Sequence, residues 1–578
     1  MTTAETDYQA LVLPYVRSPD QGVPEPAHHA VIIAGAGPIG LAAAIDFAQR
    51  GVRVLLLDDD DRLSTGSRAI CFSKRMLEIS DRLGIGRRLV DKGVTWNTGK
   101  VFLRDAMLYS FDLLPERGHH RPAFINLQQY YVEGYLLDRA RALPEIEIRW
   151  KNRIAAVTQS GDSATLDIET PDGFYKVTCD WLIAADGSRS AIRTYLGLEA
   201  KGQTFRDRFL IADVKMKADF PAERWFWFDP AFHPRQSVLL HQQPDNVWRI
   251  DFQLGWDADP ALEKAPERVK ARVQALLGAD VKFELEWVSV YTFSCVRMDT
   301  FRHGRVLFAG DAAHCVSPFG ARGANSGIQD AENLAWKLAY VLQGKAPDSL
   351  LDSYASEREF AADENIRNST RSTDFITPKS AVSRVFRDAV LTLARDHAFA
   401  RQLVNSGRLS VPAVLHDSPL NTADADGFAG AMAPGAACVD APVAGEDGKP
   451  WLLPHLGDGF VALIFGAPAG LDASATEALR QLQHGDIPLR VVFVTDAAIQ
   501  ASAQAWPGAV VLRDVEGLAA RRYDARAGTC YLIRPDQHVC ARWRGVDARR
   551  VAEALARATG NAASAVRRSA QAPAPALA

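Results

Sequence analysis

The sequence lacks the features that mark membrane, secreted and nucleic-acid-binding proteins. No apolar run approaches the roughly 18 residues that a membrane span needs. The first 28 residues lack the positive start and apolar core of a secretory signal. The 66 lysines and arginines are balanced by 70 acidic residues, and no basic run is long enough to bind a phosphate backbone. We therefore expect neither nucleic acid nor a membrane as a partner.

Cysteine pairs at metal-binding or redox spacing are also missing. The seven cysteines are scattered, and no two of them form a C-x-x-C motif. This pattern argues against a metal site and against a thioredoxin-type dithiol, and free thiols fit a reducing cytoplasm. Cys315 follows His314 in a Gly-Asp loop, where we expect it to be a small packed residue rather than a reactive thiol.

The length and composition predict several globular domains. A chain of 578 residues is too long for one core, and its composition, 47% hydrophobic and 24% charged, is ordinary. Strand and helix patterns predict an α/β protein. We expect an N-terminal arm (1–28), a nucleotide-binding domain in two parts (29–200 and 299–375), an inserted β-sheet domain (201–298), a helical connector (376–429), a small α/β domain (430–560) and a disordered tail (561–578).

The stretch VIIAGAGPIG, residues 31–40, has the spacing G-x-G-x-x-G between a strand-like run and an alanine-rich helical run. Gly35 allows a tight turn, Gly37 leaves room for a pyrophosphate, and Gly40 lets the helix pack closely on the strand. The phosphates then lie at a helix N-terminus. A second strand ends at Asp58, and an acid there binds ribose hydroxyls, which favours FAD or NAD over NADP.

Two further strand-turn-helix segments follow. They are DWLIAADGSRSAIR, residues 180–193, and GRVLFAGDAAHCVSPFGARGANSG, residues 304–327, which leads into a helix expected from about Ser326 to Leu342. The chain between them is rich in aromatic and β-branched residues, with QPDN, residues 243–246, as a hairpin turn. This composition predicts a sheet inserted into the α/β domain.

These three segments together resemble the group A flavoprotein aromatic hydroxylases, the para-hydroxybenzoate hydroxylase superfamily. Within it the chain is similar to the branch of 3-(3-hydroxyphenyl)propionate hydroxylase and phenol hydroxylase, over roughly residues 29–375 and more loosely in the C-terminal unit. The resemblance implies a Rossmann-type FAD-binding domain, an inserted β-sheet substrate domain and a C-terminal thioredoxin-like α/β domain. That last domain has no C-x-x-C, so we expect a structural or dimer-forming role for it, and a homodimer.

The resemblance also implies which residues hold the FAD. In the family an arginine after the first segment meets the pyrophosphate, here Arg68, and a glutamine contacts the cofactor; Gln128 and Gln129 both qualify, and the spacing to Glu133 favours Gln129. The aspartate of the third segment, Asp311, bonds the ribityl chain. The full expected set is Gly35, Gly37, Pro38, Gly40, Asp58, Asp59, Arg68, Gln129, Asp186, Gly187, Gly310, Asp311, Pro318, Gly320, Gly323, Ala324 and Asn325.

The implied reaction is hydroxylation of a small aromatic substrate. NADH or NADPH reduces FAD, O₂ adds at the flavin C4a position, and the resulting hydroperoxide passes its distal oxygen to the ring. The protein contributes placement, charge and exclusion of water. A helix N-terminus after Gly320 offers counter-charge to the reduced ring, and His314 is expected to be a hydrogen-bonded structural residue.

The residues that contact the substrate are less defined. We expect His241, Arg249, Gln253 and Tyr291 as candidates for orienting or deprotonating a phenol, and Pro318 in the loop against the flavin. Strand alternation puts Arg249, Asp251 and Gln253 on one face and Trp248, Ile250 and Phe252 on the other. The pattern does not say which face meets the flavin.

Three other functions share parts of this pattern. A flavin-dependent halogenase has W-x-W-x-I-P, whereas WFWFDP here has Asp229 in place of the isoleucine. A dehydrogenase or reductase on the same fold lacks oxygen transfer, and a flavin-binding sensor lacks nicotinamide oxidation. Oxygen uptake, halide dependence and nicotinamide oxidation distinguish these functions from hydroxylation.

Overall fold

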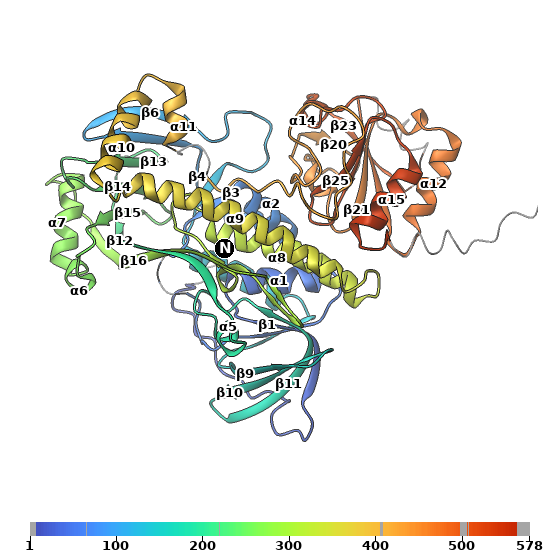
Figure 1. Ribbon diagram of the computed structural model, residues 1–578, viewed down its shortest axis with the longest axis horizontal. Helices are drawn as coiled ribbons and strands as arrows, with labels where there is room; N and C mark the ends of the chain where they lie inside the picture. Colours follow the sequence, from blue (N-terminus) through green and yellow to red (C-terminus); the bar gives the residue numbers. More distant parts are fainter. Residues whose placement is uncertain are drawn as a thin grey trace, which may run out of the picture. The chain divides into compact units, whose positions relative to one another are not determined.

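The computed structural model describes residues 7–562 except 65, 67, 219, 405–408, 497–505 and 507. The chain forms two compact units, coloured along the sequence in Figure 1. Unit 1 comprises residues 1–115, 121–331 and 362–411, and unit 2 comprises residues 116–120, 332–361 and 412–578. The domain boundaries expected from the sequence stay predictions, and nearly all of the expected disordered tail lies outside the described residues. Within the described ranges, no helix is long and apolar enough to cross a membrane.

Unit 1 contains an eight-stranded sheet with a parallel centre. Its strand order is β17-β18-β11-β1-β2-β8, with β9 and β10 added beside β11. Residues 31–33 of β1 and all of β2 are buried, as expected for parallel strands covered on both faces. The strands are β1 (Ala27–Ala34), β2 (Val54–Leu57), β8 (Ile146–Arg149), β9 (Arg153–Gln159), β10 (Ala164–Thr170), β11 (Gly173–Ala184), β17 (Arg302–His303) and β18 (Val306–Phe308).

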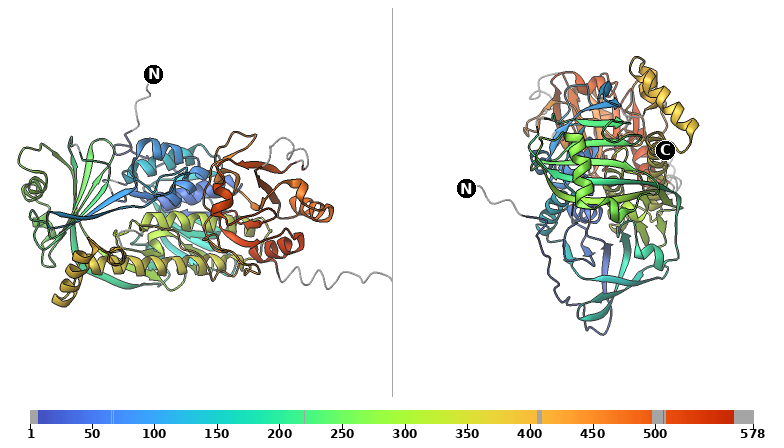
Figure 2. Two further views of the ribbon diagram at one scale, coloured as in Figure 1. Left: turned by 90° about the horizontal axis from the view of Figure 1, so that it is seen from above. Right: turned by 90° about the vertical axis from the view of Figure 1, so that its left-hand side faces the viewer.

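A second eight-stranded sheet in unit 1 has the order β19-β16-β12-β15-β14-β13-β5-β6. The predicted turn at residues 243–246 joins β14 to β15, and α6 and α7 lie beside the sheet (Figures 1 and 2). The strands are β5 (Thr98–Leu103), β6 (Ala106–Asp112), β12 (Ala200–Lys215), β13 (Arg224–Phe228), β14 (Ser237–Gln242), β15 (Val247–Leu254), β16 (Glu284–Met298) and β19 (His314–Cys315). Strands β5 and β6 come from before residue 115, so the insertion alone does not make the sheet.

The remaining elements of unit 1 are mostly helices. The third sheet has the order β3-β7-β4, with β3 (Cys71–Ser73), β4 (Val94–Trp96) and β7 (Phe124–Asn126). The helices are α1 (Pro38–Gln49), α2 (Lys74–Leu83), α3 (Gly86–Lys92), α4 (Gln129–Arg141), α5 (Ala191–Tyr195), α6 (Pro260–Glu263), α7 (Pro266–Leu277), η1 (Gly310–Ala312), α10 (Ala381–Ala394) and α11 (Ala398–Leu403).

Two longer helices, α8 (Gly323–Leu342) and α9 (Leu350–Ile376), have residues in both units. The sequence placed the start of α8 at about Ser326, which is three residues too late. A turn from Pro318 to Ala321 precedes the helix, because the amide of Ala321 donates to the carbonyl of Pro318 at 3.0 Å; only Arg322 separates this turn from Gly323. Helical backbone therefore begins at the second glycine of the GARGAN stretch.

Unit 2 contains a six-stranded sheet in the order β20-β23-β22-β21-β24-β25. Strands β21, β22 and β23 are parallel, and β24 and β25 form an antiparallel pair before the last helix, as expected for a thioredoxin-like unit. Its elements are β20 (Val443–Ala444), η2 (Leu453–His455), β21 (Phe460–Phe465), η3 (Pro468–Gly470), α12 (Ala473–Gln483), β22 (Leu489–Thr495), β23 (Val510–Asp514), α14 (Leu518–Arg522), β24 (Cys530–Ile533), β25 (Val539–Trp543) and α15 (Ala548–Ala558).

The cysteines are all free thiols, and most of them are buried. Cys530 and Cys540 lie on the neighbouring strands β24 and β25, as the sequence predicts. Burial raises the pKa of the Cys530 thiol to about 12, and it raises the pKa of Cys540 further. These thiols pack in the sheet and have no redox partner.

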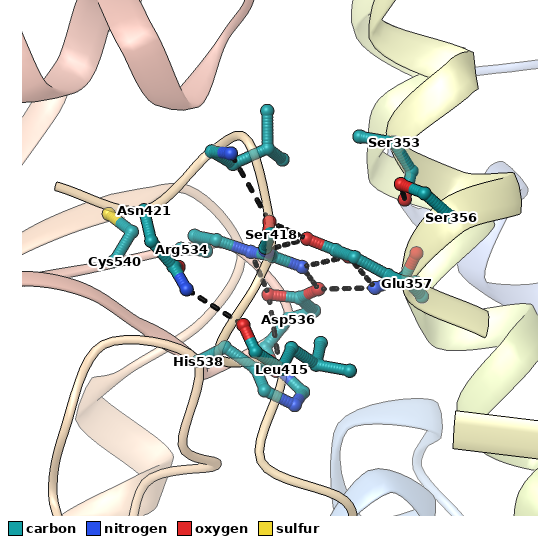
Figure 3. A network of polar contacts seen from close by, with 12 residues as sticks. Ser353, Ser356, Glu357, Leu415, Ser418, Asn421, Arg534, Asp536, His538 and Cys540 are labelled. Carbon is teal, nitrogen blue, oxygen red and sulfur yellow. Dashed lines mark hydrogen bonds and ion pairs between the residues drawn. The ribbon is translucent and has the colours of Figure 1, made fainter. Parts of the chain in front are cut away.

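Four buried charges within unit 2 come from α8, α9 and the turn between β24 and β25, and Figure 3 shows three of them, Glu357, Arg534 and Asp536. The Lys337 ammonium lies 2.7 Å from Glu357, and Arg534 donates to Glu357 at 2.6 Å and also pairs with Asp536. Burial raises the pKa of Glu357, but the charges of Arg534 and Lys337 lower it by more, so it lies below its ordinary range. Two cations and two anions thus balance among side chains that are at most 1% exposed.

We expect Arg534→Met to destabilise unit 2 by about 3–5 kcal/mol, because it leaves Glu357 and Asp536 buried without their shared cation. Urea unfolding of the full chain measures this loss. Arg549→Met is the matched control, since Arg549 pairs with Glu553 on the exposed face of α15 and its loss should change the midpoint little. Equal midpoints for the two variants would contradict the assignment.

Candidate functional site

The glycine-rich turn between β1 and α1 leaves open space at one position. Gly35 has φ +98°, and a Cβ there would lie 2.5 Å from the carbonyl oxygen of Ala185. A Cβ on Gly40 would lie 1.9 Å from the carbonyl oxygen of Gly35. In contrast, a Cβ on Gly37 would meet nothing within 4 Å. Two glycines are thus required by packing, whereas Gly37 borders free space at a helix N-terminus, which fits a pyrophosphate.

The acid at the end of β2 lies against this turn. Asp58 accepts hydrogen bonds from the amides of Ala36 at 2.6 Å and Asp60 at 2.8 Å. Burial raises the pKa of Asp58 to about 6. Asp59 is exposed beside it. The arrangement places carboxylate oxygens next to the nucleotide turn, where ribose hydroxyls are expected.

The loop that contains Arg68 is held by two side chains of α4. Gln129 accepts from the amide of Ala69 at 3.0 Å and donates to Glu133 at 2.7 Å. Glu133 in turn accepts from the backbone and hydroxyl of Ser64, both at 2.7 Å. The Gln-x-x-x-Glu spacing that favoured Gln129 over Gln128 therefore corresponds to a real contact. The Arg68 side chain is exposed and available to a ligand.

The second nucleotide segment is tied to the third. Ser190 caps α5 by accepting from the amide of Arg193 at 3.0 Å, and the Arg193 guanidinium donates to the carbonyl of Ala312 at 2.8 Å. One oxygen of Asp186 accepts from the amide of Ile192 at 3.1 Å. The other is buried without a hydrogen-bond partner in the described part of the chain, and a Cβ on neighbouring Gly187 would meet nothing within 4 Å.

The third segment turns around a buried aspartate of α8. Asp330 accepts from the amide of Gly310 at 2.9 Å and lies 2.7 Å from Nε2 of His314, whose ring stacks on Phe301. His314 is therefore a structural residue, as expected. Asp311 is exposed to solvent, yet the surrounding protein raises its pKa, chiefly by desolvation.

The N-terminus of α8 is fixed by Asn325. Its amide oxygen accepts from the backbone of Ser73 at 2.8 Å, and its nitrogen donates to the carbonyls of Cys71 at 2.9 Å and Ala321 at 2.6 Å. The side chain predicted to touch the cofactor is thus occupied by protein groups. Its contribution is to hold the first turn of α8, whose amides have no partners within the helix, in one position.

One face of the second sheet meets the Arg68 loop. Arg249 on β15 is opposite His241 on β14 and opposite Asp213 on β12. Its guanidinium donates to both oxygens of Asp213, at 2.8 and 3.0 Å, and to the carbonyl of Arg68 at 2.9 Å. The face with Arg249, Asp251 and Gln253 is therefore the one that faces the nucleotide elements.

The opposite face is a hydrophobic core. Trp248, Ile250 and Phe252 pack with Val269 and Val273 of α7. This packing resolves the choice between faces that strand alternation left open.

Two polar groups on the inner face have no partner in the described residues. His241 is 2% exposed, and its Nδ1 makes no hydrogen bond. Burial, followed by the charges of Arg224 and Arg249, holds the pKa of His241 well below its usual range. Asp251 has an unpartnered carboxylate oxygen, and burial raises its pKa to about 6. His241 is therefore a neutral imidazole at neutral pH, and its Nδ1 is free for a hydrogen bond to a ligand.

Other predicted residues have structural contacts on this face. Gln253 accepts from the amide of Ser237 at 3.0 Å, which occupies its amide oxygen. The Tyr291 ring lies 6.1 Å from that of Trp287, which stands opposite Asp213 on the sheet.

A cavity opens between this sheet and the loop before α8. It is rich in aromatic side chains, with one buried cation. The lining residues are Lys100, Val101, Phe111, Arg224, Phe226, Phe228, Phe319, Gly320, Ser372, Ile376, Val404 and Leu409.

Sequence reasoning missed three charged residues of this region. They are Asp213, Arg224 and Asp251, of which only Asp251 was placed on a face. Strand alternation after Arg224 was a usable signal, because Arg224, Phe226 and Phe228 share a face of β13.

Comparison with known proteins gives consistent results. Residues 28–369 match the FAD binding domain family. The chain is 33% identical, over 88% of its length and 93% of the relative, to 6-methylpretetramide 4-monooxygenase of Streptomyces rimosus. It is 28% identical, over 93% and 96%, to the 3-(3-hydroxy-phenyl)propionate/3-hydroxycinnamic acid hydroxylase of Klebsiella pneumoniae.

Two solved structures share the fold. The flavin-dependent monooxygenase PieE, in complex with FAD and substrate, has a TM-score of 0.76 at 21% identity, over 93% of this chain and 100% of that one. The anhydrotetracycline hydroxylase OxyS of Streptomyces rimosus has a TM-score of 0.68 at 25% identity, over 92% and 99%.

We expect Gly37→Ala to fold normally but to lose FAD. Its φ is not in the left-handed region and its Cβ meets no protein atom, so the apoprotein should melt at the wild-type temperature. The added methyl occupies the space left for the pyrophosphate, and we expect at least about tenfold weaker FAD binding, measured by titration of apoprotein. Gly161→Ala, equally open but on a distant loop, is the control. Unchanged FAD affinity in Gly37→Ala would refute the placement.

Proposed function

This chain belongs to the FAD binding domain family, and on that premise we propose that it hydroxylates a phenolic ring bound in the cavity lined by Phe226, Phe228 and Phe319. It is a flavin-dependent monooxygenase, with FAD as cofactor, NADH or NADPH as electron donor and O₂ as co-substrate. When bound, FAD accepts hydride and activates O₂ for transfer to the ring. The observation that carries the proposal is the aromatic cavity. His241, whose Nδ1 has no hydrogen-bond partner in the described residues, feels the charge of Arg224, which lines that cavity.

In this proposal the FAD lies along the three nucleotide segments. The pyrophosphate lies at Gly37 and Pro38 with Arg68 nearby, and Asp58 with Asp59 receives the ribose. The remaining proposed contacts are Gln129, Asp186, Gly187, Gly310, Asp311, Pro318, Gly320, Gly323, Ala324 and Asn325, with Gly35 and Gly40 shaping the turn. The first turn of α8 offers counter-charge to the reduced ring.

His241 is the proposed base. It accepts the phenol proton, which increases the electron density of the ring that receives oxygen. Arg249 acts as a positioning residue, because Asp213 already neutralises it and its third contact holds the Arg68 loop. Tyr291 remains a proposed substrate contact on the same face, and Pro318 closes the turn before α8.

The proposal extends to substrate class, assembly and location. Relatives act on 3-(3-hydroxy-phenyl)propionate and on 6-methylpretetramide, and the aromatic lining of the cavity suits a phenolic ring. We also propose a cytoplasmic location, which seven free cysteines support, and a homodimer, which a mass measurement in solution tests.

The direct test supplies FAD-loaded protein with NADH or NADPH and a panel of phenols of one to four rings. A substrate should accelerate nicotinamide oxidation at least about tenfold and give a product heavier by one oxygen atom. Nicotinamide oxidation that yields only hydrogen peroxide across the whole panel would contradict hydroxylation. A halide requirement or turnover without oxygen would point to other reactions on this fold.

We expect His241→Asn to lower the hydroxylation rate about 10²–10³-fold, since it removes the base while leaving FAD content unchanged. Stopped-flow measurement of product formation separates this step from flavin reduction. His28→Asn, on the exposed start of β1, is the control. A full hydroxylation rate in His241→Asn would exclude it as the base.

A further inference from the structure

The chain before β1 is buried at separate points. Among residues 7–25, which are all described, three side chains are buried, and they are Tyr8, Leu13 and Ser18. The residues between them are partly or fully exposed. This segment therefore has no continuous core of its own, and it is held by contacts at a few positions.

Tyr8 occupies the space that a side chain at Gly134 of α4 would take. A Cβ on Gly134 would lie 2.5 Å or less from three carbon atoms of the Tyr8 ring. The rings of Tyr131 and Tyr135 meet the Tyr8 ring edge to face, at centroid distances of 6.2 and 5.8 Å. The Tyr8 hydroxyl donates to Asp138 at 2.6 Å. Burial, followed by this hydrogen bond, raises the pKa of Tyr8 to about 12, so the hydroxyl stays protonated at neutral pH.

The same helix holds the Arg68 loop. Glu133, the residue before the glycine that receives Tyr8, accepts from the amide and the hydroxyl of Ser64, both at 2.7 Å. Gln129, one turn earlier, accepts from the amide of Ala69 at 3.0 Å. A displacement of α4 where Tyr8 packs would therefore reach the Arg68 loop on both sides of the arginine.

The segment before β1 also contacts the turn that carries Asp58. The amide of Leu13 donates to the carbonyl of Asp61 at 2.7 Å. Further along, Asp20 lies 2.7 Å from the guanidinium of Arg149, and the carbonyl of Arg149 accepts from the amide of Asp58 at 3.1 Å. Two contacts of this segment thus support the turn after β2, and a third supports α4.

We propose that residues 8–20 form a strap that holds the adenosine end of the FAD site, with Tyr8 as a positioning residue for the cofactor. Tyr8 acts through α4 on the Arg68 loop, while the rest of the strap supports the turn at Asp58. The inference rests on the proposed function, in which Asp58 receives the ribose and Arg68 lies near the pyrophosphate. When Tyr8 leaves its place at α4, both segments are less constrained around the nucleotide, and FAD is released faster.

The test follows FAD release from the full-length holoenzyme by flavin fluorescence after dilution. Tyr8→Ala should release FAD about tenfold faster than wild type, because the contact with α4 is lost. Gly134→Ala should have the same effect, since its methyl group displaces the ring although alanine itself favours a helix. Tyr8→Phe keeps the ring in place and should stay within about threefold of the wild-type rate.

The double variant Tyr8→Ala/Gly134→Ala tests whether the two residues act as one contact. It should also release FAD about tenfold faster than wild type, because both changes remove the same interaction. Release about 100-fold faster would mean two independent effects and would overturn the assignment of Tyr8 to Gly134.

ADP tests where the strap acts, because it carries the adenosine and the diphosphate without the flavin. Its inhibition constant against FAD binding to the apoprotein should rise by the same factor as the release rate in Tyr8→Ala and Gly134→Ala. Unchanged ADP binding would place the effect at the flavin end and overturn the proposal.

Val269→Ala is the control for lost stability. Val269 is fully buried between α7 and the second sheet, so its truncation should lower the melting temperature of the apoprotein without changing FAD release. If Val269→Ala released FAD as fast as Tyr8→Ala, general destabilisation would explain the effect and the proposal would be wrong. FAD release at the wild-type rate in Tyr8→Ala would also overturn it.

Failure of the proposed function gives a different result. FAD release is measured without nicotinamide or substrate, so faster release from Tyr8→Ala in a protein that hydroxylates none of the phenols would support the strap and refute hydroxylation. Hydroxylation by a protein whose Tyr8→Ala variant retains FAD normally would do the reverse.

Discussion

The buried pair between Arg249 and Asp213 is the interaction on which the site depends. The register of β12 and β15 places the two residues opposite each other, and the guanidinium still has a donor for the carbonyl of Arg68. One side chain thereby joins the substrate-side sheet to the loop beside the nucleotide turn. The pair is internally neutral, whereas on the same face the Nδ1 of His241 and one carboxylate oxygen of Asp251 have no hydrogen-bond partner in the described residues.

Hydrogen bonds from buried or partly buried side chains hold the segments around the proposed site in place. Asn325 fixes the start of α8 to β3, Asp330 fixes the loop at Gly310, and Gln129 with Glu133 fixes the loop at Arg68. Each of these side chains is occupied by backbone groups of a segment distant in sequence. Asn325 and Gln129, which the family pattern marks as cofactor contacts, hold segments of the chain together, which is a physical reason for polar side chains at those positions.

Much of this arrangement is readable from the sequence, for identifiable reasons. Glycine spacing depends on local backbone geometry, so the turn at Gly35 was predictable, and period-two alternation separated the two faces of β15. However, alternation alone does not tell which of the two faces of β15 is turned toward the nucleotide elements. The packing of α7 against Trp248 and Phe252 shows that their face is turned away from those elements. The participation of β5 and β6 in the sheet and the place of Arg224 in the cavity lining depend on tertiary structure, which no local sequence pattern predicts. The cofactor contacts themselves remain predictions.

The burial of the cysteines has a consequence for the lifetime of the enzyme. A monooxygenase that turns over without substrate releases hydrogen peroxide, which attacks thiolates rather than thiols. Burial raises the pKa of Cys71 to about 11 and that of Cys179 and Cys315 to about 12. These three sulfurs therefore stay in the thiol form, which hydrogen peroxide oxidises slowly.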